Sequence, residues 1–321
     1  MESIDVVTLS KGNSMAVIDI QNGAKLKLLV LTDPKTKKTH TIVDDKTTTE
    51  NYRRGGSFFL YPWVGRLRSD ELDLKDKKLK IDPPIRDPNG YPIHGFYTKS
   101  RRKIIQKAEN ILELAPADDY KPYDEYFPNF VEKFILEEDR LHIDNIFEGD
   151  KTKKYPLYFA YGYHPYFGFD GKKVNDLILR TNLHQIVELD SKTLLPKIED
   201  GKLVLDKVES IINEKEPIKE ADLNHLFFFD ENKAKDEPWF QLIDPEEKVG
   251  VEIASNISNG RKNVDLVYWQ IFTPPDRKTV AIEPMTSPAD SFNIEFPKHN
   301  VVMKDEDDFK EGNFEIRLIN V

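Results

Sequence analysis

The chain has 321 residues and a formal charge of −10, because 57 acidic residues outnumber 47 basic ones. An acidic surface repels phosphate backbones and anionic lipids, so this charge disfavours nucleic-acid binding and electrostatic membrane docking. Cysteine is absent, which excludes disulfides, thiolate nucleophiles and cysteine-ligated metal centres.

Short stretches with a hydrophobic period of two run through the chain and predict β-strands. In chain order they cover residues 6–9, 15–20, 25–31, 39–43, 111–114, 131–136, 141–146, 177–180, 240–243, 249–253, 267–272 and 314–318. Helical patterns are short: the best covers residues 206–213, with weaker turns near Asp70 and Glu220. The sequence therefore predicts an all-β fold, a large antiparallel β-sandwich with few short helices. No linker or composition break is visible, so we expect one domain spanning residues 1–321.

The hydropathy pattern and the N-terminal residues predict a soluble protein. No stretch approaches about 18 consecutive apolar residues, so no transmembrane helix is expected. The beginning, MESIDVVTLSKGN, lacks the cationic and then apolar order of a secretory signal. We expect a cytoplasmic protein without membrane or nucleic-acid partners, and its charged surface favours a monomer or a weak homodimer.

Three segments place a titratable side chain among aromatic, proline and glycine residues. They are residues 52–67 followed by 90–96, residues 159–167, and residues 280–293. Such surroundings are stiff and poorly solvated, so they can hold a side chain and shift its pKa. His94, His164 and Glu283 form a candidate acid–base set, and Arg66 is a candidate donor to substrate oxygens. Taken singly, these residues also fit core histidines and a strand end, and spacing alone does not unite them.

Four motifs, taken in order, resemble the aldose 1-epimerase (galactose mutarotase) family. They are Arg66 within residues 62–67, His94-Gly95, His164-Pro165-Tyr166-Phe167, and Glu283-Pro284 continuing to Asp290 and Asn293. Each motif alone is weak, but their order over most of the chain is specific. The resemblance implies the galactose mutarotase-like supersandwich, which agrees with the period-two pattern.

The resemblance also implies roles in the interconversion of the α and β anomers of a hexose. Glu283 would be the base at the C1 hydroxyl and His164 the acid at the ring oxygen, on opposite sides of the anomeric centre. His94 would stabilise the open form and Arg66 would bind sugar hydroxyls, with no metal and no cofactor. Trp269 could offer its face to the sugar, as could Trp63, Phe96 and Tyr161, although core packing is the alternative for each.

Two positions depart from the family pattern. Gly65 stands where an asparagine usually precedes the arginine, and Asn224 stands where an acidic sugar ligand is expected, with Asp222 two residues earlier. An asparagine can bind a hydroxyl but carries no charge, so these departures concern sugar preference more than catalysis.

Other functions remain open on the sequence. Arg53 and Arg54 precede Gly55-Gly56 and could bind the phosphate of a hexose 6-phosphate. A non-catalytic carbohydrate-binding sandwich is an alternative of another class. A glycosidase would pair Glu283 with a second carboxylate, either Asp290 or Asp222. His94, His164 and Glu283 could also hold a metal, but no tight His-x-x-x-His spacing supports a metal site.

Overall fold

Strands dominate the computed structural model, which describes residues 6–45, 55–207, 212–230, 236–255, 264–295 and 298–321. Helical turns in this part include the short 3-10 segments η2 (Asp124–Tyr126) and η3 (Val174–Asp176). The prediction of an all-β fold is confirmed. Within the described ranges, no helix is long and apolar enough to cross a bilayer.

Three antiparallel sheets make up most of the structure. The first runs β1 (Val6–Lys11), β2 (Ser14–Asp19), β3 (Lys25–Thr32) and β4 (Thr39–Asp44). The second, which we call the outer sheet, runs β15 (Ile178–Thr181), β21 (Trp239–Asp244), β22 (Val249–Ser255), β26 (Phe309–Asn320), β11 (Arg140–Glu148), β10 (Asn129–Leu136), β9 (Ile111–Pro116) and β8 (Arg102–Lys107). The third, which we call the site sheet, runs β19 (Leu205–Lys207), β16 (Gln185–Val187), β20 (Asn224–Phe228), β23 (Tyr268–Phe272), β24 (Val280–Met285), β13 (Gly162–Tyr163) and β5 (Phe59–Leu60), with β14 (Tyr166–Phe167) also pairing with β24.

Three two-stranded pairs complete the strand inventory of the described residues. They are β12 (Leu157–Phe159) with β25 (Val301–Met303), β17 (Ile198–Glu199) with β18 (Lys202–Leu203), and β6 (Glu71–Asp73) with β7 (Lys78–Lys80). Every segment that the period-two pattern predicts as a strand overlaps an observed strand. The pattern works because successive side chains of a strand point to opposite faces of its sheet.

The predicted helix over residues 206–213 is wrong at its start. Residues Leu205–Lys207 form β19 and pair with β16, so that Asp206 lies opposite Ile186. Pairing with a neighbouring strand overrides the weak local helical pattern there. Residues 208–211 lie outside the described residues. The turn expected near Glu220 is present.

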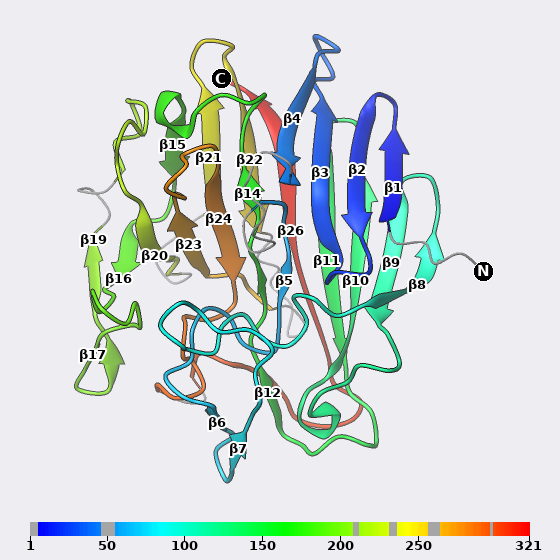
Figure 1. Cartoon of the computed structure of the whole chain (residues 1–321), viewed down its shortest axis with the longest axis vertical. Coiled ribbons are helices and arrows are strands. Elements are labelled where there is room, and N and C mark those ends of the chain that lie inside the picture. The colour runs from blue at the N-terminus through cyan, green and yellow to red at the C-terminus, as the bar shows by residue number, and fades with distance from the viewer. Residues whose placement is uncertain (1–5, 46–54, 208–211, 231–235, 256–263, 296–297) are drawn as a thin grey trace.

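The core lies between layers of sheet. Figure 1 shows the strands of the first and site sheets on one side of the molecule, with the outer sheet behind them. Their facing surfaces form one large hydrophobic cluster that includes Leu29, Phe134, Trp269 and Ile316. Burial of this surface is the main stabilising contribution to such a sandwich.

One ion pair lies inside this core. Arg102 Nε is 2.5 Å from Oε2 of Glu132, and both side chains have 0% exposure. The hydroxyl of Tyr163 donates to Oδ1 of Asn145 at 2.8 Å and lies 3.2 Å from the other oxygen of Glu132. The pair therefore ties the outer sheet to β13, the strand that immediately precedes His164.

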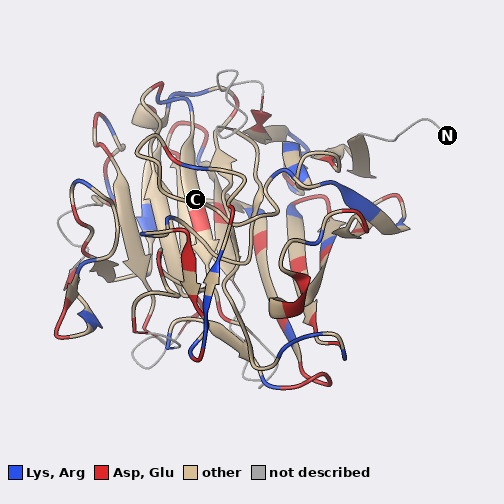
Figure 2. Ribbon diagram, turned by 60° about the horizontal axis from the view of Figure 1, so that its bottom comes forward, with Lys and Arg blue, Asp and Glu red and all other residues tan. Residues whose placement is uncertain are grey.

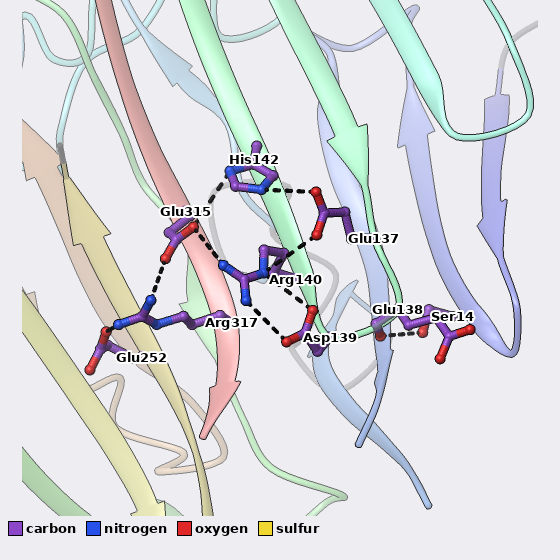
Figure 3. A network of polar contacts seen from close by, with 9 residues as sticks. All are labelled: Ser14, Glu137, Glu138, Asp139, Arg140, His142, Glu252, Glu315 and Arg317. Atoms are coloured by element: carbon purple, nitrogen blue, oxygen red, sulfur yellow. Dashed lines mark hydrogen bonds and ion pairs between the residues drawn. The ribbon is translucent and has the colours of Figure 1, made fainter. Parts of the chain in front are cut away.

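The opposite face of the outer sheet is polar. Strands β10 and β11 alternate between buried and partly exposed residues along their length. Figure 3 shows the outward side chains of β11, β26 and β22 joined in a network in which Glu315 contacts Arg140, His142 and Arg317. Charged residues of both signs are interspersed over the view of Figure 2. The charge pattern thus directs one face of the sheet to solvent and the other to the core.

Candidate active site

The three segments singled out in the sequence meet at a cavity of about 210 Å³ on the face of the site sheet that points away from the core, where β20, β23 and residues 189 and 194 complete the lining. This volume is below the about 300–1,000 Å³ of pockets for drug-sized ligands, which suits a single sugar ring. The polar side chains that line it are Arg66, His94, His164, Asn224, Gln270 and Glu283. The remaining described lining residues are mainly apolar, as expected for a pocket that fixes its ligand with few polar groups.

Strand register places Glu283 in this cavity. Gln270 of β23 lies opposite Glu283 of β24, and Leu226 of β20 lies opposite Gln270. These three residues form one row across the sheet. Ile282 beside Glu283 points to the other face and packs in the main core. The period of two therefore separates the core residues of β24 from its functional residue.

His164 lies between β13 and β14 and is fixed by both backbone and rings. Its N–H donates to the carbonyl of Phe58 at 3.0 Å. Its ring stacks on Tyr166 with centroids 4.7 Å apart and lies 4.9 Å from the ring of Phe58. Two aromatic rings from the segments singled out in the sequence thus flank the imidazole, and the His164 side chain is 8% exposed.

His164 and Glu283 are in contact. Nε2 of His164 lies 3.2 Å from Oε1 of Glu283, and their side chains are 8% and 5% exposed. Burial lowers the pKa of His164 to about 3. Burial also raises the pKa of Glu283 well above its usual value, although the nearby Arg66 opposes this shift. At pH values between these two pKa values, the pair therefore favours one proton on the carboxyl group and a neutral imidazole.

This contact is closer than we expected. The sequence-based expectation placed the acid and the base on opposite sides of the anomeric centre, whereas the structure places them side by side. The geometry still suits the chemistry, because the C1 hydroxyl oxygen and the ring oxygen are bonded to the same carbon. Two adjacent groups can each reach one of these oxygens.

The His94-Gly95 turn brings a second imidazole to the pair. The N–H of His94 donates to the carbonyl of Gly65 at 2.9 Å. The ring of His94 lies 5.3 Å from that of His164 at an interplanar angle of 83°. Gly95 has a φ of +76°, and a Cβ there would lie 1.9 Å from the carbonyl oxygen of Tyr61. Only glycine fits at position 95, which explains this half of the motif.

Arg66 is held in the cavity wall by a buried carboxylate. Its Nε donates to Oδ2 of Asp87 at 2.7 Å, and the Asp87 side chain is 2% exposed. Burial opposes ionisation of Asp87, but the Arg66 hydrogen bond and the N–H groups of Tyr91 and Asn89 outweigh it and lower its pKa. With Nε bonded to Asp87, the terminal nitrogens are the donors that Arg66 can offer to a ligand.

Asp290 supports the Arg66 segment instead of lining the cavity. Its N–H donates to the carbonyl of Arg66 at 2.8 Å. Its carboxylate pairs with Arg68 and accepts from Asn293 Nδ2 at 2.8 Å. The end of the fourth motif, Asp290 with Asn293, therefore stabilises the loop of the first motif, which contains Arg66.

Gly65 contacts Ala289 across the cavity wall. Gly65 has a φ of +56°, and a Cβ there would lie 2.8 Å from Cβ of Ala289. Asparagine tolerates this backbone conformation, but its Cβ would meet the same methyl group. The departure from the family pattern at Gly65 is thus accompanied by Ala289, whose methyl group crowds the space that a Cβ at position 65 would occupy.

The cavity also contains a residue that we did not predict. Gln270 lines it and donates through Nε2 to Oδ1 of Asn224 at 3.0 Å. Position 270 follows Trp269 in a predicted strand, so the period of two places its side chain on the face opposite that of Trp269. The sequence offered no signal that this face of β23 lines a site.

The remaining predicted residues lie elsewhere. Asp222 lines an adjacent hollow that shares Asn224 with the cavity. Trp269 has 0% exposure and its indole N–H donates to the carbonyl of Leu266 at 2.8 Å, so it is a core residue and not a described lining residue of the cavity. Trp63, Phe96 and Tyr161 are also buried in the core. Arg53 and Arg54 lie outside the described residues.

The geometry bears on the open alternatives. Among the described lining residues, Glu283 is the sole carboxylate, so neither Asp222 nor Asp290 flanks the cavity with it. The described residues contain no cluster of three histidine, aspartate or glutamate side chains arranged to hold a metal ion.

Comparisons with known proteins identify the family of the chain and agree with its fold. The family model described as "Aldose 1-epimerase" matches residues 5–310. A galactose mutarotase-like protein from Clostridium acetobutylicum has a TM-score of 0.75 at 17% identity, covering 98% of this chain and 95% of that chain. A GalM/aldose epimerase homologue from C. elegans has a TM-score of 0.70 at 15% identity, covering 98% and 99%. A galactose 1-epimerase from Lactobacillus acidophilus NCFM has a TM-score of 0.67 at 14% identity, covering 98% and 94%. The comparison with curated protein sequences gives no match.

Proposed function

The chain belongs to the aldose 1-epimerase family, and from this premise we propose that it interconverts the α and β anomers of a hexose by ring opening and closure. The observation that carries the proposal is the buried His164–Glu283 contact in the wall of a cavity of about 210 Å³ that Arg66 and His94 also line. A free sugar is the partner that such a cavity suits.

Ring opening requires that the C1 hydroxyl lose a proton while the ring oxygen gains one. Movement of the shared proton from Glu283 to His164 across their 3.2 Å contact yields a carboxylate and an imidazolium. Glu283 then takes the proton of the C1 hydroxyl and His164 donates to the ring oxygen as the bond from C1 to that oxygen breaks. An open-chain aldehyde results.

Ring closure reverses these steps after rotation about the bond between C1 and C2. The open aldehyde then presents its other face to the C5 hydroxyl. His164 accepts the proton of this hydroxyl and Glu283 returns a proton to the carbonyl oxygen. The pair carries one proton before and after each half-reaction, so the cycle needs no external acid or base.

The neighbouring side chains would orient the sugar. His94, which is perpendicular to His164, would donate to the oxygen that becomes the carbonyl. Arg66 would bind hydroxyls through its terminal nitrogens, and Asn224 with Gln270 would contact hydroxyls further from C1. Fixing the substrate against the acid–base pair lowers the entropic cost of the proton transfers.

Polarimetry on freshly dissolved α-D-glucose and α-D-galactose tests the proposal. The wild-type protein should accelerate equilibration, and Glu283→Gln and His164→Asn should each lower the rate by about 10²–10⁴-fold. Ser10→Ala, at a partly buried position in β1 outside the cavity, serves as the matched control. The proposal fails if no free aldose or aldose 6-phosphate equilibrates faster with the wild-type protein, or if Glu283→Gln matches it.

A further inference from the structure

The sequence contains asparagine followed directly by glycine at Asn22-Gly23, Asn89-Gly90 and Asn259-Gly260. The third pair lies outside the described residues. Such a pair is chemically labile, because the backbone nitrogen of the glycine can attack the asparagine side chain and no Cβ on the glycine obstructs the approach. The surroundings of the first two pairs differ, and this difference decides which of them can react.

The pair Asn89-Gly90 lies in an open turn. Both residues are exposed, and a Cβ on Gly90 would meet no heavy atom within 4 Å. Among the described residues, the Asn89 side chain makes no hydrogen bond. The N–H of Gly90 donates to the carbonyl of Asp87 at 3.0 Å and closes a β-turn. This bond lies within the turn itself, so it can open without displacing a distant segment of the chain.

The pair Asn22-Gly23 is held by its surroundings. Nδ2 of Asn22 donates to Oδ2 of Asp19 at 3.0 Å. Gly23 is buried, and its N–H donates to the carbonyl of Ser100 at 3.0 Å. A Cβ on Gly23 would overlap the carbonyl oxygen of Thr98, so the backbone is packed against a distant segment. The same dipeptide is thus open in one place and immobilised in the other, which provides an internal control.

The open turn belongs to the loop that fixes Arg66. Oδ1 of Asp87 accepts from the N–H groups of Asn89 and Tyr91, both at 2.9 Å. Oδ2 of the same carboxylate accepts from Nε of Arg66 at 2.7 Å. The N–H of Asp87 also donates to the carbonyl of Tyr91 at 2.9 Å. The orientation of Arg66 therefore depends on the length of the main chain between Asp87 and Tyr91.

We propose that Asn89 is a site of spontaneous deamidation and that the modification weakens ligand binding in the catalytic cavity. The nitrogen of Gly90 loses its proton and bonds to the side-chain carbonyl carbon of Asn89, while the carbon–nitrogen bond of the amide breaks and ammonia leaves. Water then opens the resulting succinimide at either of its carbonyl groups. One opening yields aspartate, and the other yields isoaspartate, in which the main chain runs through the former side chain.

The two products differ in their effect on the site. Isoaspartate adds one methylene group to the main chain between residues 89 and 90, which displaces the N–H of Tyr91 from the Asp87 carboxylate. Asp87 then holds Arg66 less firmly, and the terminal nitrogens of Arg66 are less well oriented toward a ligand. Aspartate leaves the length of the main chain unchanged and adds an exposed charge, so its effect should be smaller. This consequence rests on the proposed function, whereas the modification itself does not.

Incubation of the purified protein at mildly alkaline pH, followed by peptide mass spectrometry, tests the modification. The tryptic peptide of residues 87–99 contains Asn89 as its only asparagine, and an isoaspartate O-methyltransferase detects isoaspartate in it. We expect Asn89 to convert at least about tenfold faster than Asn22 in the folded protein, and the two rates to converge in urea. Equal rates in the folded protein, or a ratio that urea leaves unchanged, would overturn the inference.

Polarimetry of fresh and incubated protein tests the consequence. The isoaspartate form should show a KM for the sugar that is higher on the order of tenfold. Asn89→Ser should keep its own initial KM through the same incubation, whereas the matched control Asn22→Ser should change as the wild type does. Asn89→Asp, which adds the charge without the methylene group, should raise KM less than incubation does. An unchanged KM in fully converted protein overturns the link to the cavity. If no sugar equilibrates faster with fresh protein, the proposed function alone fails, since the mass-spectrometric result does not depend on turnover.

Discussion

Nε2 of His164 and Oε1 of Glu283 lie 3.2 Å apart, although one residue comes from the middle of the chain and the other from near its end. Burial displaces their pKa values in opposite directions, downward for His164 and upward for Glu283. Between the two folded-state pKa values the pair therefore holds one proton, on Glu283. In the unfolded chain the glutamate instead loses its proton above about pH 4.5, and the histidine gains one below about pH 6.5. This difference makes folding stability depend on pH.

The difference in unfolding free energy between wild type and Glu283→Gln should depend on pH. The raised pKa of Glu283 means that the folded chain keeps a proton that the unfolded chain loses above about pH 4.5. The stabilisation from this proton is fully present below that pH and declines as pH rises toward the folded pKa. The wild type should thus lose up to about 1.4 kcal/mol per pH unit relative to the variant.

The sign for His164 is opposite, because its pKa falls from 6.5 to about 3 on folding. Its contribution is lost as pH falls from 6.5 toward 3. In wild type the contributions of the two groups offset each other between about pH 4.5 and 6.5, where folded and unfolded pairs each hold one proton. Urea unfolding at several pH values, with both proteins in one buffer series, checks this. A constant difference from pH 4.5 to 8.5 would contradict it.

Gly65→Ala should destabilise the protein by about 1–3 kcal/mol, because position 65 has a positive φ and the new methyl group meets Ala289. Urea unfolding measures the loss. The same substitution in an Ala289→Gly background should cost less, since the contact at 2.8 Å is then removed. Equal costs in both backgrounds would show that the contact with Ala289 does not restrict position 65.

Asp87→Asn should raise KM for the sugar more than it lowers kcat. The substitution removes the charged partner of Arg66 Nε while retaining an acceptor of the same shape. A hydrogen bond to a charged group contributes about 1.5–3 kcal/mol, so a KM increase on the order of tenfold is expected. Steady-state polarimetry separates the two constants, and Asp118→Asn, at a 76% exposed side chain in a surface ion pair, is the control. A fall in kcat at constant KM would contradict this positioning role.

Glu132→Gln should destabilise the fold by about 3–5 kcal/mol, because it leaves the fully buried Arg102 without its anionic partner. The double variant Arg102→Met with Glu132→Leu should recover a large part of this loss, since it removes both buried charges. Guanidinium unfolding of the three proteins provides the measurement. If the double variant is less stable than Glu132→Gln, the ion pair contributes more than its desolvation costs.

Much of the fold could be predicted because its main signal is local. The alternation in segments such as residues 131–136 and 141–146 is visible in the sequence and reappears as burial in β10 and β11. The helix predicted over residues 206–213 failed at β19 because pairing with β16 decides the conformation there. A short segment without strong periodicity takes its conformation from its neighbours.

The residues of the site could be named in part, but their geometry could not. The aromatic and proline-rich surroundings identified His164 and Glu283 as unusual, and their order pointed to a family. Nothing in the sequence placed them in contact, placed Gln270 beside Asn224, or placed Trp269 in the core. Which face of a strand meets another sheet, and which lines a cavity, depends on how the sheets pack.

The sequence by itself determined which residues alternate, where the chain turns and which side chains have titratable groups, because these properties belong to neighbouring residues. Only the tertiary structure decided which of those side chains share a cavity and lose their water. Proton affinity depends on burial and on charges a few ångströms away, and strand pairing between distant parts of the chain determines both.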